Sequence, residues 1–226
     1  MAKLSMKEYV YQTLKYAIYE QKLVPGQKMV EHDISSSLSI SRTPIRQAFT
    51  QLQEEGFLTI LPNKGAQVIN PTIEEITEAF THRKNLELLA TSNIMQAIST
   101  NNIHRLSELV KLEKESYQQK DLLGYTEVNK EFHYTLLKGC RNRFLKNHTL
   151  KMINQTHIYL ALYDHFFHID EKENIRSSNE HQMLITLIKE KEIEAFSQLL
   201  AKHISTATEE YKSRVSRFHQ ASDLFN

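Results

Sequence analysis

The sequence predicts a mostly α-helical protein with two segments of different character. Only five of the 226 residues are glycine and four are proline, so few residues interrupt helices. All four prolines and three of the glycines occur at or before residue 71, which leaves the rest of the chain nearly free of helix breakers. We therefore expect a punctuated N-terminal domain, residues 1–70, and a longer all-α domain, residues 71–226.

The N-terminal segment predicts three short helices followed by a β-hairpin. Residues 4–21 place apolar side chains on one helical face, and residues 31–38 form a second helix after a Val-Pro-Gly turn. A third helix, residues 41–55, begins beside Ser41, a typical N-cap residue. Residues 57–70 hold two β-favouring runs around Pro-Asn-Lys-Gly. Elements in this order indicate a winged helix-turn-helix.

The second segment predicts an antiparallel bundle of six or seven α-helices. Long helices joined by short connections pack as antiparallel neighbours. Thr72 can cap the first of them, and leucines such as Leu89 and Leu112 are assigned to the bundle core. The expected helices are, approximately, 72–98, 102–119, 121–139, 142–166, 171–190 and 192–218.

Composition excludes several classes of protein. The 28 Lys and Arg residues balance 27 Asp and Glu residues, for a formal charge of +1, so the whole chain is not a general polyanion binder. The single cysteine, Cys140, excludes an intrachain disulfide framework and fits a reducing compartment. No apolar run approaches the roughly 18 residues of a membrane helix, and the N-terminus lacks a signal-peptide pattern. We expect a cytoplasmic protein without a membrane partner.

The outer face of the third predicted helix carries residues suited to reading DNA. Arg42, Thr43 and Arg46 remain outside when the apolar stripe is buried. Arginine makes bidentate contacts with guanine edges and also binds phosphates. Lys64 and Gly65, at the hairpin tip, would suit a wing that follows the DNA backbone. Alone, this pattern is equally typical of a solvated helix face.

Several short motifs in the first segment resemble the DNA-binding domain of GntR-type transcriptional regulators. The resemblance covers about residues 8–69 and rests on VPGQKMVEHDISSSL and SISRTPIRQAFTQLQEEGFLTILPNKGAQV, which keep the order and spacing of that family. It implies that Arg42, Thr43 and Arg46 contact double-stranded operator DNA and that Gly65 belongs to the wing.

The sequence departs from the GntR pattern at two positions. His32 stands where some members have a basic residue that contacts DNA, and Ser39 stands where glycine is usual. The first departure weakens one expected DNA contact, and the second concerns the geometry of the turn.

Three of the eleven histidines are placed to converge. Asn129 and His133 are four residues apart, so they leave one face of a helix. His181 and His203 lie symmetrically about the polar Lys-Glu-Lys-Glu break near residue 192, so antiparallel pairing of the last two helices brings them level. Three imidazoles and an amide oxygen could bind a divalent metal ion such as Zn²⁺ or Ni²⁺, or could form a buried polar network without an ion. We interpret the following histidines as surface or local residues: His148, His157, His165, His168 and His219.

The second segment also resembles the FCD effector domain of the FadR subfamily of GntR regulators, over about residues 72–217. The match rests on the order and spacing of His133, His181 and His203. It implies a dimerising helical domain that binds a small organic acid, often beside a metal held by Asp-x-x-x-His and two later histidines. Asn129 occupies the position of that Asp, which makes the ligand set neutral and leaves an amide oxygen for the metal or the effector.

One arginine is the expected partner of the acid. Arg83, in THRKNLELLA, matches the R-x-x-L-E element of the FCD family, which implies that it binds the effector carboxylate. Glu87, at the end of that element, is expected to be structural.

The leading hypothesis is a ligand-responsive transcriptional regulator, a homodimer that represses until a small organic acid binds. A second is a hydrolase-like metalloenzyme, because three histidines with open coordination positions can activate water. Against it, Glu180 is the only adjacent general base for His181, and neighbouring helix positions point about 100° apart. A third, an architectural DNA-binding protein, would not need the histidines.

Overall fold

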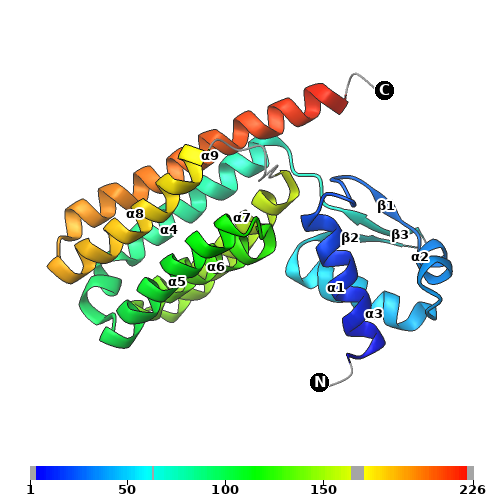
Figure 1. Ribbon diagram of the computed structural model, residues 1–226, viewed down its shortest axis with the longest axis horizontal. Helices are drawn as coiled ribbons and strands as arrows, with labels where there is room; N and C mark the ends of the chain where they lie inside the picture. Colours follow the sequence, from blue (N-terminus) through cyan, green and yellow to red (C-terminus); the bar gives the residue numbers. More distant parts are fainter. Residues whose placement is uncertain (1–3, 63, 164–170, 223–226) are drawn as a thin grey trace. The chain divides into compact units, whose positions relative to one another are not determined.

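The computed structural model describes residues 4–62, 64–163 and 171–222 and forms two compact units, Met1–Thr72 and Ile73–Asn226. Side chains at 171–175, 214 and 217–222 are outside this description. The prediction of a mostly α-helical chain is confirmed (Figure 1). The elements in order are α1 (Met6–Tyr19), β1 (Lys28–Met29), α2 (Glu31–Leu38), α3 (Arg42–Glu55), β2 (Leu58–Leu61), β3 (Gly65–Val68), α4 (Ile73–Ala97), α5 (Thr100–Gln118), α6 (Leu122–Leu136), the 3-10 turn η1 (Leu137–Gly139), α7 (Arg143–Tyr163), α8 (Glu171–Glu190) and α9 (Ile193–Ser222).

The first unit packs three helices against a small antiparallel sheet with strand order β1-β3-β2. Lys28 pairs with Gln67, and Leu58 pairs with Val68. The strand β1 was not expected, because two residues are too few to show the alternation that marks a strand. The buried apolar side chains of the helices include Val10, Leu14, Ile18, Ile45, Ala48, Phe49 and Leu52.

The turn between α2 and α3 fixes the orientation of the third helix. Ser39 ends α2 in the left-handed conformation, with φ 54° and ψ 38°, a conformation that glycine adopts more readily. Gly56 ends α3 with φ 97°. Because the apolar stripe of α3 is buried, its opposite face is exposed to solvent.

Gly65 has a structural reason for being glycine. Its φ is 86°, and a Cβ there would lie 2.1 Å from the carbonyl oxygen of Met29 in β1. A side chain would therefore collide with the neighbouring strand. The sheet requires glycine at this position, whether or not the wing approaches DNA.

The second unit is a helical bundle, with six α-helices and one 3-10 turn among its described residues. Figure 1 shows α8 and α9 running side by side in opposite directions, with α4 next to them. The helix α4 packs against α7 and α9, and α5 packs against α6 and α8. None of the described helices is long and apolar enough to cross a membrane.

Two leucines expected in the bundle core are exposed instead. Leu89 is 66% exposed and Leu112 is 40% exposed. The buried face of α4 has two charged side chains, Arg83 and Glu87, at its centre. Because this face of the helix points inward, Leu89 points toward solvent. The buried residues of α4 are Ile76, Ala79, Phe80, Arg83, Glu87, Ala90, Thr91 and Ile94.

Candidate functional site

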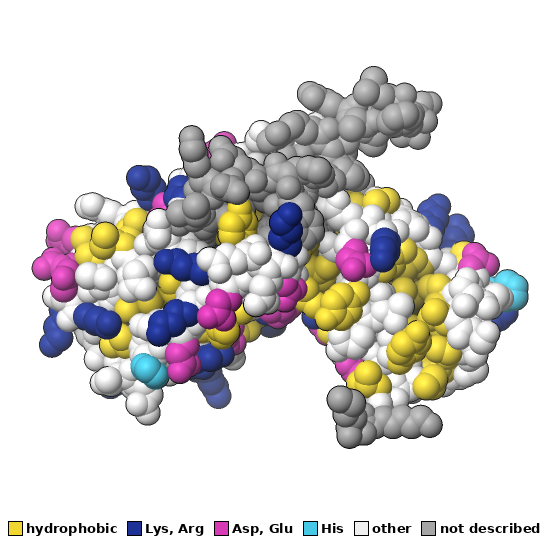
Figure 2. All heavy atoms as spheres, viewed as in Figure 1, with side chains coloured by type: hydrophobic (Ala, Val, Ile, Leu, Met, Phe, Trp, Pro, Cys, Tyr) yellow, Lys and Arg dark blue, Asp and Glu magenta, His cyan; other side chains and the backbone are white. Residues whose placement is uncertain are grey.

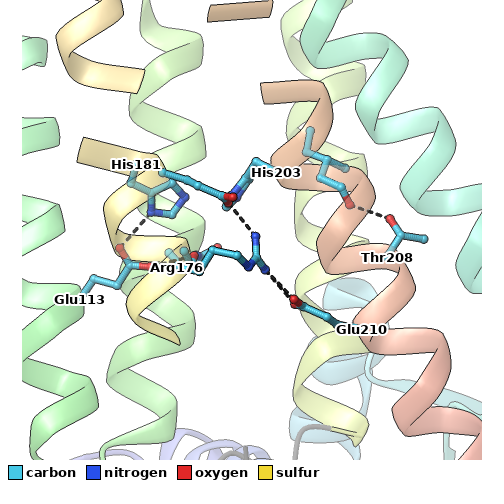
Figure 3. A network of polar contacts seen from close by, with 10 residues as sticks. Glu113, Arg176, His181, His203, Thr208 and Glu210 are labelled. Carbon is cyan, nitrogen blue, oxygen red and sulfur yellow. Dashed lines mark hydrogen bonds and ion pairs between the residues drawn. The ribbon is translucent and has the colours of Figure 1, made fainter. Parts of the chain in front are cut away.

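Three histidines from different helices meet inside the bundle. His133 comes from α6, His181 from α8 and His203 from α9, and all three are buried. One ring nitrogen of each lies within 4.8 Å of the others. The rings of His181 and His203 have centroids 4.8 Å apart, which is the level placement that antiparallel pairing predicts. Figure 3 shows these two side chains facing each other between α8 and α9.

Each of these imidazoles is held by a carboxylate at Nδ1. A neutral imidazole that donates its Nδ1–H in this way directs the lone pair of Nε2 toward the centre of the cluster. This is the arrangement of metal-binding histidines, in which an outer carboxylate fixes the ring and raises its basicity. The pairs are His133 with Glu87 (2.9 Å), His181 with Glu113 (2.9 Å) and His203 with Glu180 (2.7 Å).

The donor set fits a divalent metal ion. Among the described residues, Nε2 of His133 and Nε2 of His181 are buried and have no hydrogen-bond partner. Buried polar atoms without partners are rare and costly. A cation at the centre of the cluster would satisfy both, and imidazole nitrogens suit Zn²⁺, Ni²⁺ or a similar ion.

The protonation states support metal binding. Burial lowers the pKa of His133 to about 3, against the opposing effect of Glu87, so the ring is neutral at pH 7. Burial alone would raise the pKa of Glu87, but His133 and Arg83 outweigh it and bring the pKa to about 2. Because the imidazole is neutral at pH 7, the permanent charge of Arg83 is what keeps Glu87 ionised there.

Arg83 is buried in the bundle core, where its guanidinium pairs with other buried side chains. The residue is only 3% exposed. Its Nε donates to Glu87 at 2.6 Å, and its Nη1 donates to Oγ1 of Thr156 at 3.0 Å. The sequence assigns Arg83 to the effector. The structure places it in the wall of a cavity and also gives it this internal role.

Asn129 is held in one orientation by Glu113. Its Nδ2 donates to Oε1 of Glu113 at 3.2 Å. A carboxylate accepts hydrogen bonds and does not donate them, so the amide nitrogen must face Glu113 and Oδ1 must face away. Asn129 lines the cavity, and its oxygen is therefore the atom available to a cation.

A cavity of about 80 Å³ adjoins the histidine cluster. Its wall includes Asn129, His133 and His203 together with two arginines, Arg83 and Arg176. This volume exceeds the roughly 10–15 Å³ that a single water requires, so the cavity has room for more than one water-sized group. It can admit a small ligand beside the histidines.

His157 was interpreted as a surface or local residue, and a place at the surface is wrong. The side chain is 2% exposed, and its ring centroid lies 6.5 Å from that of His133. No second residue at a matching helical spacing indicated a partner for His157, so spacing alone could not place it. His148 is exposed. His165, His168 and the side chain of His219 lie outside the described residues.

Arg176 links α8 and α9 beside the cavity, and nothing in the sequence pointed to it. Nη1 donates to Oε2 of Glu180 at 2.7 Å, and Nη2 donates to the two carboxylate oxygens of Glu210 at 2.9 and 2.8 Å. Glu180 is also the partner of His203. The cluster and the cavity wall thus share one carboxylate.

The expected DNA-reading residues lie on the surface of the first unit. Arg42, Thr43 and Arg46 are exposed on α3, and Lys64 is exposed before β3. Nε of Arg46 donates to both carboxylate oxygens of Glu31 in α2, at 2.9 and 2.8 Å.

A histidine from α2 lies beside Arg42, the first residue of α3. Nη2 of Arg42 lies 3.4 Å from Nδ1 of His32. Basic and acidic side chains are mixed on the surface. Figure 2 shows Lys and Arg side chains interspersed with Asp and Glu side chains on the visible face.

A winged helix-turn-helix joined to a helical bundle with an internal cavity is the architecture of a ligand-responsive transcriptional regulator. Residues 6–68 match the family of bacterial regulatory proteins named the gntR family, and residues 78–206 match the FCD domain. The chain therefore belongs to the GntR-type transcriptional regulators with an FCD domain.

Relatives agree with this assignment along nearly the whole chain. The HTH-type transcriptional regulator YdhC of Bacillus subtilis is 27% identical over 89% of both chains. The transcriptional repressor RspR of Escherichia coli is 20% identical over 90% of this chain and 88% of its own. Because the matching families and relatives are transcriptional regulators, the metalloenzyme hypothesis is not supported.

Solved structures show the same fold. Escherichia coli McbR/YncC superposes with a TM-score of 0.72, at 19% identity, over 93% of this chain and 99% of its own. A putative GntR transcriptional regulator from Rhodococcus sp. RHA1 superposes with a TM-score of 0.70, at 23% identity, over 92% and 98%.

Proposed function

We propose that this regulator is a cytoplasmic homodimeric repressor that leaves its operator when a small organic acid binds beside a divalent metal ion. One observation carries the proposal. A single cavity is lined both by histidines that fit a cation and by arginines that fit an anion. One relative, RspR, is named a transcriptional repressor, which favours repression.

The DNA contacts are proposed on α3 and the wing. Arg42 and Arg46 would contact base edges or phosphates in the major groove, and Thr43, at the start of α3, would bind a phosphate. Lys64 and Gly65 would follow the adjacent backbone. A two-fold dimer would match a pseudo-palindromic operator, because each subunit reads one half-site.

The ion is proposed at His133, His181 and His203, with Oδ1 of Asn129 as a further ligand. Zn²⁺ or Ni²⁺ suits three imidazoles and an oxygen. When bound, the ion supplies positive charge for a carboxylate of the acid. Asn129 and Arg83 would contact the acid from the cavity wall.

Regulation requires a difference in affinity between two arrangements of the regulator. The acid must bind more tightly to the arrangement that does not bind DNA, because a ligand shifts an equilibrium only by its differential affinity. The helices α8 and α9 contribute both cluster residues and cavity residues, so they would respond directly to the acid.

The metal site is tested by elemental analysis of the purified protein after incubation with Zn²⁺ and removal of free ion. We expect about one ion per chain, and a loss of that ion in the His133→Ala, His181→Ala double variant. His148→Ala, which changes an exposed histidine, should retain it. Equal metal content in the wild type and the double variant would eliminate the site.

The DNA surface is tested with an operator selected from random-sequence DNA by the intact protein. Arg46→Ala should lower operator affinity by roughly 10-fold or more, as expected for loss of a bidentate base contact. Unchanged affinity and unchanged salt dependence would show that α3 does not read DNA.

A further inference from the structure

Two arginines line the cavity, but they differ in their freedom to bind a ligand. Arg83 neutralises Glu87 inside the core, so withdrawing it would leave a buried carboxylate uncompensated. Arg176 and its partner Glu210 have side chains that are 28% and 22% exposed. An incoming anion can therefore reach Arg176 and displace Glu210, whose carboxylate has access to water.

The contact between Arg176 and Glu210 leaves part of the guanidinium unused. Both oxygens of Glu210 accept from Nη2, and among the described residues the buried Nε of Arg176 has no hydrogen-bond partner. The strongest carboxylate–guanidinium geometry is a fork with two parallel hydrogen bonds. A ligand carboxylate that took Nε and Nη2 together would improve on the internal contact.

We infer that Arg176 binds a carboxylate of the effector in exchange with Glu210, and that the effector is a short dicarboxylate. The inference deepens the proposed function and rests on it. Without the ligand, the carboxylate of Glu210 accepts from Nη2. The ligand carboxylate would replace it there, because the two are the same chemical group.

The second carboxylate follows from the two cationic partners that the cavity would offer, the ion and a guanidinium. His203, one of the proposed ion ligands, and Arg176 line the same cavity, so an acid with two carboxylates can bind the ion with one and the guanidinium with the other. Apolar side chains, among them Phe80, Leu160 and Ala207, line it as well, and they suit a short methylene chain. The small volume of the cavity, about 80 Å³, favours a short dicarboxylate.

The exchange of Glu210 for the ligand would change contacts at the histidine cluster. Oε2 of Glu180 accepts from Nη1 of Arg176 and from Nδ1 of His203. A shift of Arg176 toward a ligand changes the contacts of the carboxylate that orients His203. The same shift releases Glu210, which lies two turns after His203 on α9.

The test compares succinate with butyrate, which has the same chain length and one carboxylate fewer. Calorimetric titration of the intact, Zn²⁺-loaded protein should give an affinity at least about 10-fold higher for succinate, since charge-assisted hydrogen bonds are the stronger ones. Arg176→Gln should remove this preference. Arg176→Lys, which keeps the charge without the fork, should restore part of it.

The distinctive expectation is a gain of affinity in a second variant. Glu210→Gln removes the internal competitor, so succinate should bind several-fold more tightly than to the wild type. Glu209→Gln, on the adjacent exposed residue that pairs with Lys212, should leave succinate affinity unchanged. Circular dichroism of each variant verifies that it is folded.

The outcomes separate the inference from the proposed function. Equal binding of butyrate and succinate by the wild type, or unchanged succinate affinity in folded Glu210→Gln, overturns the roles of Arg176 and Glu210 and leaves an acid-responsive regulator. If the protein binds the ion and the operator but neither acid, the proposal of a dicarboxylate effector is overturned. That result would also count against any small organic acid as the effector.

Discussion

Glu180 accepts a hydrogen bond from Nδ1 of His203 at 2.7 Å, across the contact between α8 and α9. The next residue along α8, His181, donates from its own Nδ1 to Glu113 in α5. Two consecutive residues of one helix therefore contribute to the cluster differently. His181 belongs to the set that fits the ion, and Glu180 orients a member of that set from another helix.

Loss of this orienting carboxylate should weaken metal binding. We expect Glu180→Ala to reduce Zn²⁺ affinity by about 10- to 100-fold, the usual effect of removing an outer partner of a metal-binding histidine. Competition with a chromophoric chelator measures it. Glu190→Ala, at the exposed end of the same helix, is the matched control. Similar affinities in both variants would show that Glu180 does not support the site.

The buried pair of Arg83 and Glu87 gives a prediction about stability. Arg83→Met should lower the free energy of unfolding by about 3–5 kcal/mol, because it leaves the Glu87 carboxylate buried without its cation. Adding Glu87→Gln should recover part of this loss, since the uncompensated charge is then removed. Urea unfolding followed by far-UV circular dichroism measures both. Strictly additive losses would contradict the coupling.

The contact between Glu31 and Arg46 leads to a prediction about sequence discrimination. Glu31 occupies Nε of Arg46, which leaves Nη1 and Nη2 for the two acceptors of a guanine. Glu31→Gln should raise affinity for non-specific DNA, since it removes a negative charge, and should reduce the ratio of operator to non-specific affinity by several-fold.

The control for this effect is Asp33→Asn, which removes the same charge from the exposed surface of the same helix. It should raise affinity for both DNAs without changing their ratio. If the two variants behave alike, Glu31 acts only through its charge and does not position Arg46.

The close approach of β1 to Gly65 predicts a second effect on stability. Gly65→Ala combines positive φ with a Cβ 2.1 Å from the carbonyl oxygen of Met29, and we expect a loss of more than about 2 kcal/mol. Gly26→Ala has a similar φ of 78°, but the nearest atoms to its Cβ would be those of the Asn70 side chain, at 3.6 Å or more. It should therefore cost about 1–2 kcal/mol. Thermal unfolding of the intact chain compares them, and equal losses would exclude the collision.

Helix periodicity predicted most of the fold because each helix is long enough to repeat its apolar pattern several times. The short strand β1 gave no such signal, and only its pairing with β3 makes it a strand. In α4 the assumption that apolar residues mark the buried face misplaced Leu89. Arg83 and Glu87 are buried there because they compensate each other's charge, a relationship that hydrophobicity does not report.

The site was predictable where it depends on spacing along helices. His133, His181 and His203 meet because α8 and α9 pair antiparallel. Glu113 and Glu180 were not predicted as their partners, because these contacts depend on how side chains from different helices pack. Glu180 was set aside because it points away from His181, and that same direction takes it to His203.

Among the residues that the structure describes, none pairs with Nε2 of His133 or Nε2 of His181, and this also affects how long the protein persists in a cell. A bundle whose interior is completed by an ion opens more often without it, and opened chains are what proteases degrade. If the protein depends on the proposed ion, a cell starved of that metal would lose molecules of the regulator as well as the response to the acid. The amount of regulator would then depend on the supply of the metal, before any acid binds.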